Sequence, residues 1–387
     1  MAVNVVVLFY NIGPYHIARL ESARRALEAI GGKLAAIQIV ATTSEHPWGA
    51  VDVPDYVTTL EEFQAGNQPR LSSPRLLTEA LDRLRPDAVA VPGWGFDFAR
   101  QALKWCRKND VARVLMSESH RDDAPRAWWK ERIKSVLWIS KFDSALVGGV
   151  LHSEYLQSLG MPGEKIFFGY DLVDNEGFAA DVDAARGGNL RPTAVSSPYF
   201  LASSRFMARK NLGRLIDAFQ MARERQGDQF RHQLVILGDG PLRRELESQI
   251  ERGGLKEVVH LPGFLTRQEI IPWLGFADAF VHPALHEQWG LVVNEAMAAA
   301  VPVAVSRNCG CFPELVVEGV TGFGFDPESV SEMADSLCRL SDLGDRRSAM
   351  GLEARRHLNE GLPVSRFGEG LVDAVQTALR STRSKAV

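Results

Sequence analysis

Short apolar runs rich in β-branched residues alternate with amphipathic helical segments along most of this 387-residue sequence. Strands that are apolar throughout are buried on both faces, and strands separated by helices pair in parallel. The alternation therefore predicts an α/β fold built on parallel sheets that helices cover on both faces. In the first half of the chain the expected strands are Asn4–Phe9, Leu34–Val40, Ala88–Val91, Arg113–Ser117 and Ala145–Gly148.

The alternation lapses at residues 181–197, which are small, polar and broken by Gly and Pro, and then restarts. This predicts two Rossmann-like domains, residues 1–180 and 198–363, joined by a linker at 181–197. Two open parallel sheets that face each other would enclose one ligand cleft at the carboxyl ends of their strands. Residues 364–387 hold a last helical segment that either completes the second domain or packs back on the first. The expected strands of the second domain are Tyr199–Ser203, Gln233–Leu237, Val258–Leu261, Ala279–His282 and Val303–Ser306.

Composition narrows the class of protein. A net charge of -4 provides no general attraction to nucleic acid, so we do not expect a nucleic-acid partner. The first residues lack a charged leader, and no apolar run approaches the roughly 20 residues that span a bilayer. The 4 cysteines are scattered and form neither a disulfide framework nor a zinc-binding spacing. These features predict a cytoplasmic protein.

Two glutamates stand on either side of an expected helix start. Glu287 lies in a short loop after a strand, and a helix begins near Gly290 and Leu291 and carries Glu295. At about 1.5 Å of rise per residue, the two carboxylates are too far apart to act as an acid and base on one bond. We therefore expect two separate roles. The helix start between them suits a phosphate.

The segment His-Glu287-Gln-Trp-Gly-Leu-Val-Val-Asn-Glu295-Ala-Met-Ala, followed by a Pro-Val strand, resembles the signature of a known family. That family comprises the retaining glycosyltransferases of GT-B fold typified by sucrose, trehalose and mannosyl transferases (glycosyltransferase group 1, family four). The resemblance implies that Glu287 lies beside the donor sugar and that Glu295 binds the ribose of the nucleotide. Further motifs, Gly310-Cys-Phe-Pro-Glu and Glu318-Gly-Val-Thr-Gly, extend it over most of the second domain.

The segment from Phe200 to Leu212 resembles the strand-loop-helix element in which this family holds the donor diphosphate. The resemblance makes Arg205 and Lys210 the cations that bind it, and leaves Arg209 as a surface residue. An arginine fork and a mobile lysine charge can neutralise the negative charge that builds on a leaving nucleotide.

Two residues of the first domain follow strands. Gly13 closes the loop after the first strand, where a glycine would let the backbone approach a ligand, although the family often has two glycines there. His120 matches in position the family histidine that reaches the donor sugar. For both residues a structural role at a strand or helix end is the alternative.

Two patterns have an ordinary alternative explanation. Residues 100–141 contain 11 basic and 5 acidic residues with four tryptophans, which predicts either a peripheral membrane surface or core tryptophans beside a solvated face. Asp181-Val-Asp183 has the spacing of a metal site in another transferase architecture, but no strand precedes it. We therefore predict no metal and no cofactor.

Taken together, the sequence predicts a retaining, metal-independent hexosyltransferase. Its donor is a nucleotide-sugar, UDP-sugar favoured over GDP-sugar, and its acceptor is a hydroxyl group of a glycan, a lipid-linked glycan or a small metabolite. The alternatives are a nucleotide-sugar epimerase of similar architecture and a nucleotide-sugar-binding protein without activity.

Overall fold

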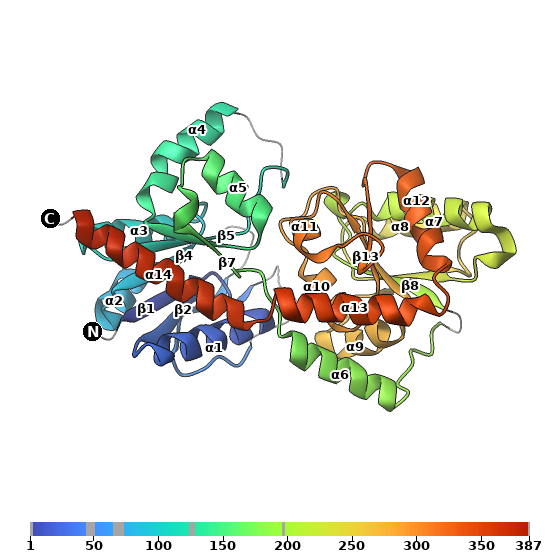
Figure 1. Ribbon diagram of the computed structural model, residues 1–387, viewed down its shortest axis with the longest axis horizontal. Coiled ribbons are helices and arrows are strands. Elements are labelled where there is room, and N and C mark those ends of the chain that lie inside the picture. Colours follow the sequence, from blue (N-terminus) through green and yellow to red (C-terminus); the bar gives the residue numbers. More distant parts are fainter. Residues whose placement is uncertain (1–2, 44–50, 65–72, 124–127, 196–197, 386–387) are drawn as a thin grey trace. The chain divides into compact units, whose positions relative to one another are not determined.

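The computed structural model describes residues 3–43, 51–64, 73–123, 128–195 and 198–385, and these form two compact units (Figure 1). Unit 1 comprises residues 1–121, 125–173 and 364–387, and unit 2 comprises residues 122–124 and 174–363. Each unit is built on one sheet in which all recorded pairings are parallel. This confirms the predicted α/β class with two Rossmann-like units.

Unit 1 contains a seven-stranded sheet in the order β3-β2-β1-β4-β5-β6-β7. The central strands are apolar and buried along almost their whole length, as a sheet covered on both faces requires. The strands are β1 (Asn4–Phe9), β2 (Lys33–Thr43), β3 (Val57–Gln64), β4 (Ala88–Pro92), β5 (Ala112–Ser117), β6 (Ser144–Val147) and β7 (Ile166–Phe168).

The last helix of the chain belongs to unit 1, which settles the position that the sequence left open for residues 364–387. Helix α14 (Ser365–Lys385) packs against α1 and against β5, β6 and β7. The hydroxyl of Ser144 donates to the carbonyl of Ala374 at 2.7 Å. The other helices of unit 1 are α1 (Pro14–Ala29), α2 (Pro74–Leu84), α3 (Asp97–Lys108), α4 (Trp128–Leu137) and α5 (Val150–Ser158).

Unit 2 repeats the same strand order with six strands, β10-β9-β8-β11-β12-β13. Its core contains Phe200, Phe219 and Phe325, all fully buried. The strands are β8 (Tyr199–Ser203), β9 (Gln233–Leu237), β10 (Val259–Gly263), β11 (Ala279–His282), β12 (Val303–Ser306) and β13 (Gly322–Phe325). The helices are α6 (Asn175–Gly187), α7 (Leu212–Gln226), α8 (Arg243–Arg252), α9 (Arg267–Phe276), α10 (Leu291–Ala298), α11 (Phe312–Leu315), α12 (Val330–Ser341) and α13 (Arg346–Gly361).

Three strands were not predicted, and all three lie at the edges of the sheets: β3, β7 and β13. An edge strand pairs on one side only and needs less apolar sequence. This explains the polar sequence VTTLEEFQ of β3 and the short β7. Strand β13 is buried, but its sequence GFGF is half glycine and reads as a turn.

The predicted linker at 181–197 is wrong in its first part. Residues 175–187 form α6, whose first turn is capped by the carboxylate of Asp174, which accepts a hydrogen bond from the amide of Gly177 at 3.1 Å. The helix buries Phe178, Val182 and Ala185, which lie on one face at helical spacing. Small and polar residues stand between them, so the pattern was not recognised in the sequence. The chain passes from unit 1 to unit 2 between residues 173 and 174. Residues 196–197 lie outside the described part of the chain.

Helix α6 is fixed to unit 2 through charged side chains. Arg186 donates to the carbonyls of Gly275 and Ala299, both at 2.7 Å. Asp183 accepts two hydrogen bonds from Arg355, at 2.7 and 2.9 Å. Asp183, which belongs to the Asp-x-Asp pattern, is therefore engaged in packing this helix.

No helix within the described ranges is long and apolar enough to cross a membrane.

Candidate active site

The strand order of each sheet marks where a ligand can bind. In unit 2 the chain winds outward from β8 in both directions, so the connections from β8 and from β11 leave the sheet on opposite sides. Open parallel sheets bind ligands at such a switch point, beyond the carboxyl ends of the two strands. The loops that follow β8 and β11 contain the predicted residues Arg205, Lys210 and Glu287.

Hydrogen bonds join the loop after β8 to the loop after β11. Asn211 adopts a left-handed conformation, with φ of 59°, and begins α7. Its buried amide donates to the carbonyl of Pro283 at 3.0 Å and to that of Pro327 at 2.7 Å. The amide of Leu285 donates to the carbonyl of Arg209 at 2.8 Å. These bonds hold the short 3₁₀ helix η3 (Ala208–Lys210) against the loop that carries Glu287.

Three basic groups surround the carboxylate of Glu287. Lys210 forms an ion pair with Oε2, and Nη1 of Arg209 lies 3.2 Å from Oε1. Nε2 of His282, the last residue of β11, lies 3.4 Å from Oε2. Glu287 is only 11% exposed, so its charge depends on these neighbours.

Burial and neighbouring charges set the protonation states of Glu287 and His282. Burial raises the pKa of Glu287, but the contacts with His282 and Lys210 outweigh burial and hold the pKa well below its usual range. Burial lowers the pKa of His282. Glu287 is therefore ionised and His282 is neutral at pH 7.

Gly290 is required by the geometry beside Glu287. Its φ of 107° is rarely adopted by other residues, and a Cβ there would lie 3.4 Å from Nε2 of His282 and 3.6 Å from Cγ of Glu287. Gly290 caps α10, whose first residue is Leu291. Glu295 is buried in the second turn of this helix. The structure thus separates Glu287 on a loop from Glu295 on a helix.

Arg205 is placed differently from Lys210. It follows β8 in the same loop, but its side chain is exposed, and within the described residues no ion pair with Glu287 is recorded for it. The sequence analysis missed Arg209 and His282 as neighbours of Glu287. Arg209 was assigned to the surface, and nothing in the sequence distinguishes it from an exposed arginine. His282 could have been predicted from the sequence, because it is the last residue of an expected strand and such residues lie at the ligand-binding end of a parallel sheet.

In unit 1, Gly13 begins α1. Its amide donates to Nδ1 of His16 at 2.9 Å, and its φ of -100° is open to any residue. Gly149 and His152 repeat this arrangement at the start of α5, with a distance of 3.1 Å. His120 is buried and packs edge-on against the ring of His152, with centroids 5.5 Å apart. The structure therefore shows a packing contact for His120, and its role at a donor sugar stays a prediction.

The switch point of unit 1 lies between β1 and β4 and carries aromatic rings that the sequence analysis did not single out. Tyr10 follows β1, and Phe96 belongs to the loop after β4 and is 39% exposed. Phe96 stacks on Phe98 with centroids 5.4 Å apart, and Tyr10 lies 6.2 Å from Phe96. An exposed ring at a ligand-binding edge offers an apolar face to a ligand.

Unit 1 also contains a buried arginine, Arg19, next to a buried aspartate, Asp171. Nη2 of Arg19 is 3.9 Å from Oδ1 of Asp171, and Nε of Arg19 donates to the carbonyl of Leu172 at 2.8 Å. Burial raises the pKa of Asp171, and the negative charge of Glu118 raises it further. Glu118, which directly follows β5, therefore acts on this internal aspartate.

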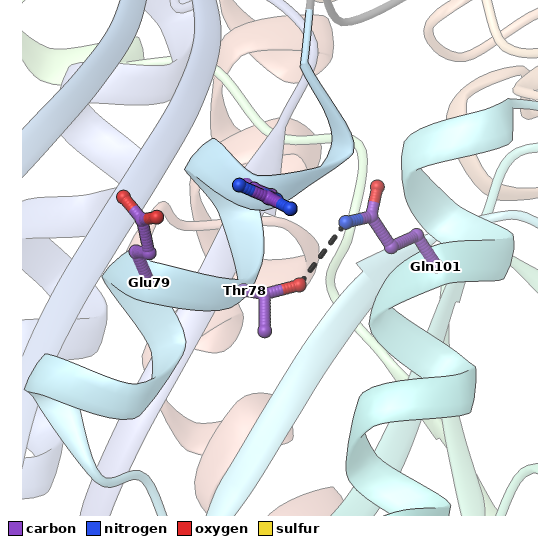
Figure 2. A pocket seen from close by; sticks show the side chains of 4 residues that line it. Thr78, Glu79 and Gln101 are labelled. Carbon is purple, nitrogen blue, oxygen red and sulfur yellow. Dashed lines mark hydrogen bonds between the residues drawn. The ribbon is translucent and has the colours of Figure 1, made fainter.

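A surface pocket of unit 1 is separate from these residues. It is lined by Arg75, Thr78 and Glu79 of α2 and by Gln101 of α3, and the amide of Gln101 donates to the hydroxyl of Thr78 at 3.2 Å (Figure 2). No predicted site residue lines this pocket. Among the described residues there is also no cluster of three or more His, Cys, Asp or Glu side chains that could hold a metal ion.

Comparison with known proteins gives concordant results. Residues 191–357 match the family model described as "Glycosyl transferases group 1". The amylovoran biosynthesis glycosyltransferase AmsK of Erwinia amylovora is 30% identical over 238 residues, which cover 60% of this chain and 53% of AmsK. The solved structure of α,α-trehalose 6-phosphate synthase from Burkholderia multivorans has a TM-score of 0.74 at 14% identity and covers 100% of this chain and 99% of its own. Anabaena Alr3699/HepE in complex with UDP and glucose has a TM-score of 0.69 at 16% identity, with 96% and 99% covered.

The two parallel sheets and their solved neighbours define a protein of GT-B glycosyltransferase fold. More particularly, the stretch that matches the glycosyl transferases group 1 model makes up most of unit 2 and includes Arg209, Lys210, His282 and Glu287. The matched stretch spans about half the length of the curated relatives.

Proposed function

We propose that this chain is a retaining hexosyltransferase that uses a nucleotide-sugar donor and a hydroxyl acceptor. The observation that carries the proposal is the cluster of Lys210, Arg209 and Glu287 at the switch point of the group 1 domain. It combines cations that suit a diphosphate with a carboxylate that suits a developing positive charge on a sugar. UDP is favoured over GDP because the neighbour HepE binds UDP and glucose.

In the proposed reaction, the bond between the anomeric carbon and the diphosphate breaks, and a bond to the acceptor oxygen forms on the same face. The acceptor proton passes to the departing diphosphate. Lys210 and Arg205 neutralise the charge that grows on this leaving group, and the start of α10 adds amide dipoles. Glu287 orients the sugar and stabilises its positive charge, while Glu295 holds the ribose. No metal ion has a part in this scheme.

The acceptor, a glycan, a lipid-linked glycan or a small metabolite, is proposed to bind at the carboxyl edge of the unit 1 sheet. The support is the position of Tyr10 and Phe96 at its switch point. Gly13, in the same loop as Tyr10, is proposed to let the backbone approach the donor. His120 is proposed to contact the donor sugar. His120→Ala should impair transfer while nucleotide binding and melting stay normal, whereas a joint loss of binding and stability would make this histidine structural.

The deciding experiment combines donor screening with product analysis. Thermal-shift measurements with UDP, GDP, ADP and their hexoses should identify a donor, because a ligand specific to the folded state raises its stability. Nucleotide release should then require an acceptor and should persist after dialysis against EDTA. Proton NMR of the product should show the anomeric configuration of the donor. Inversion would exclude the retaining mechanism, and turnover without an acceptor or binding without turnover would favour an epimerase or a binding protein.

We also propose a peripheral membrane contact through α4 of an otherwise cytoplasmic protein. Ile133, Val136 and Leu137 of this helix are 47%, 66% and 47% exposed, within the segment that has an excess of basic residues. Trp105 is buried instead, and the side chains of Trp128 and Trp129 lie outside the described part of the chain.

Sedimentation with vesicles tests this contact. Binding should require phosphatidylglycerol and should fall in the double variant Ile133→Ser/Val136→Ser. The exposed Leu352→Ser in unit 2 is the matched control. Equal sedimentation of all three proteins would contradict the proposal.

A further inference from the structure

His282 is a buried polar residue that the proposed reaction leaves without a role. It ends β11 at the switch point, and its side chain is 1% exposed. Among the described residues its Nε2 atom has no well-formed hydrogen-bond partner. A buried polar atom without a partner destabilises the folded state, so a residue of this kind needs an explanation. The polar group that Nε2 faces is Oε2 of Glu287, 3.4 Å away.

Lys210 and His282 approach the same oxygen of Glu287. Lys210 forms its ion pair with Oε2. The proposed reaction requires Lys210 to bind the donor diphosphate instead. When the lysine turns toward the diphosphate, Oε2 loses its strongest partner and a second negative group arrives nearby. Both changes favour protonation of Glu287.

Arg209, Cys309 and Cys311 also lie near Glu287, but none of these three supplies a buried charge at Oε2. Arg209 contacts Oε1 and its side chain is 47% exposed, so solvent screens its charge. The thiols of Cys309 and Cys311 approach from the loop before α11, and burial raises the pKa of both, so they stay uncharged. His282 is a buried donor that stays 3.4 Å from Oε2 when Lys210 turns away.

We propose that His282 is a positioning residue that donates a hydrogen bond from Nε2 to Oε2 of Glu287 and keeps this carboxylate ionised and oriented when Lys210 moves to the diphosphate. The inference rests on the proposed function. Lys210 then pairs with Glu287 before the donor binds and with the diphosphate afterwards. His282 keeps a hydrogen bond to Glu287 in both states.

Three variants separate this role from packing. His282→Phe keeps a ring but removes the donor, and His282→Gln keeps a donor near the position of Nε2. His232→Phe is the matched control, because His232 is also a buried histidine of unit 2. It precedes β9, at the amino-terminal end of the strands and away from the switch point, and pairs with Asp278 at 3.0 Å.

The pH dependence of turnover is the first readout. The kcat profile reports the donor complex and the kcat/KM profile reports the free enzyme, in which Lys210 still pairs with Glu287. In His282→Phe the acid limb of kcat should move to higher pH, and kcat at pH 6 should fall about 10- to 100-fold, as expected for a lost hydrogen bond to a charged group. The acid limb of kcat/KM should move less. His282→Gln should restore kcat to within about threefold, and His232→Phe should affect melting only.

The second readout does not depend on catalysis. Carbon-13 labelling of glutamate carboxyl groups allows Glu287 to be titrated by NMR in the UDP complex, with Glu287→Gln identifying its signal. The carboxyl should stay ionised from pH 5 to 8 in the wild type and in His282→Gln, and should take up a proton in His282→Phe. Identical titrations in the three proteins, with UDP bound and transfer intact, would overturn this inference alone. A wild type that binds no nucleotide would overturn the proposed function together with it.

Discussion

At the residue scale, Glu287 shows how one carboxylate acquires its properties from side chains that are distant in the sequence. Lys210 and Arg209 come from η3, and His282 comes from the end of β11. Because Lys210 is both the partner of Glu287 and the proposed ligand of the diphosphate, the two functions compete for one ammonium group. Donor binding must therefore break an existing ion pair.

Glu287→Gln tests this competition. Turnover should fall about 10²–10³-fold, because the carboxylate no longer stabilises charge in the transition state. UDP should bind severalfold more tightly than to the wild type, because Lys210 is already free. Lys210→Ala should weaken UDP binding, and Lys256→Ala, a change at an exposed lysine paired with Glu251, should leave it unchanged. Calorimetry measures these affinities, and weaker UDP binding by Glu287→Gln would refute the competition.

At the element scale, one side chain joins the loops that follow β8 and β11. Asn211 begins α7, and its amide reaches the carbonyls of Pro283 and Pro327, which lie on two other connections of unit 2. The side-chain NH2 group of Asn211 has two hydrogens, so it can donate to both carbonyls at once. The geometry around Glu287 depends on this junction.

Asn211→Ala should reduce the free energy of unfolding by about 3–4 kcal/mol, because two buried carbonyls lose their partner and alanine resists the left-handed conformation. Asn189→Ala is the control, since Asn189 is also left-handed, with φ of 50°, but exposed. It should cost about 1 kcal/mol, the conformational part alone. Urea denaturation measures both values, and equal losses would show that the bonds to Pro283 and Pro327 contribute nothing.

At the scale of the whole molecule, the chain leaves unit 1 after Val173, forms unit 2 and returns to unit 1 with α14. Helix α14 packs so closely on β7 that one position of the helix requires glycine. A Cβ at Gly370 would lie 2.1 Å from the carbonyl oxygen of Phe168, so only glycine lets α14 approach β7. The seven-stranded sheet is thus covered partly by the last helix of the chain.

Gly370→Ala should destabilise unit 1 by about 2–3 kcal/mol, because backbone atoms must move apart to admit the methyl group. Gly187→Ala in α6, where a Cβ would meet nothing within 4 Å, should be neutral or slightly stabilising. Hydrogen exchange should show lost protection in α1 and α14 with unit 2 unaffected. Loss of protection spread equally over both units would contradict the assignment of α14.

The amino-acid sequence was enough to predict the α/β class, the two units and the position of nearly every central strand, because buried parallel strands need continuous apolar runs. It also determined Glu287, Glu295 and Lys210 as candidates, since local motifs carry them. Local patterns do not encode the edge strands β3, β7 and β13, which are polar, very short or glycine-rich, or α6, whose buried Phe178, Val182 and Ala185 are separated by small and polar residues. Only the packing of the folded chain sets these elements and the surroundings of Glu287. Arg209 and His282 become its neighbours only because parallel strands bring the loops after β8 and β11 to one edge of a sheet.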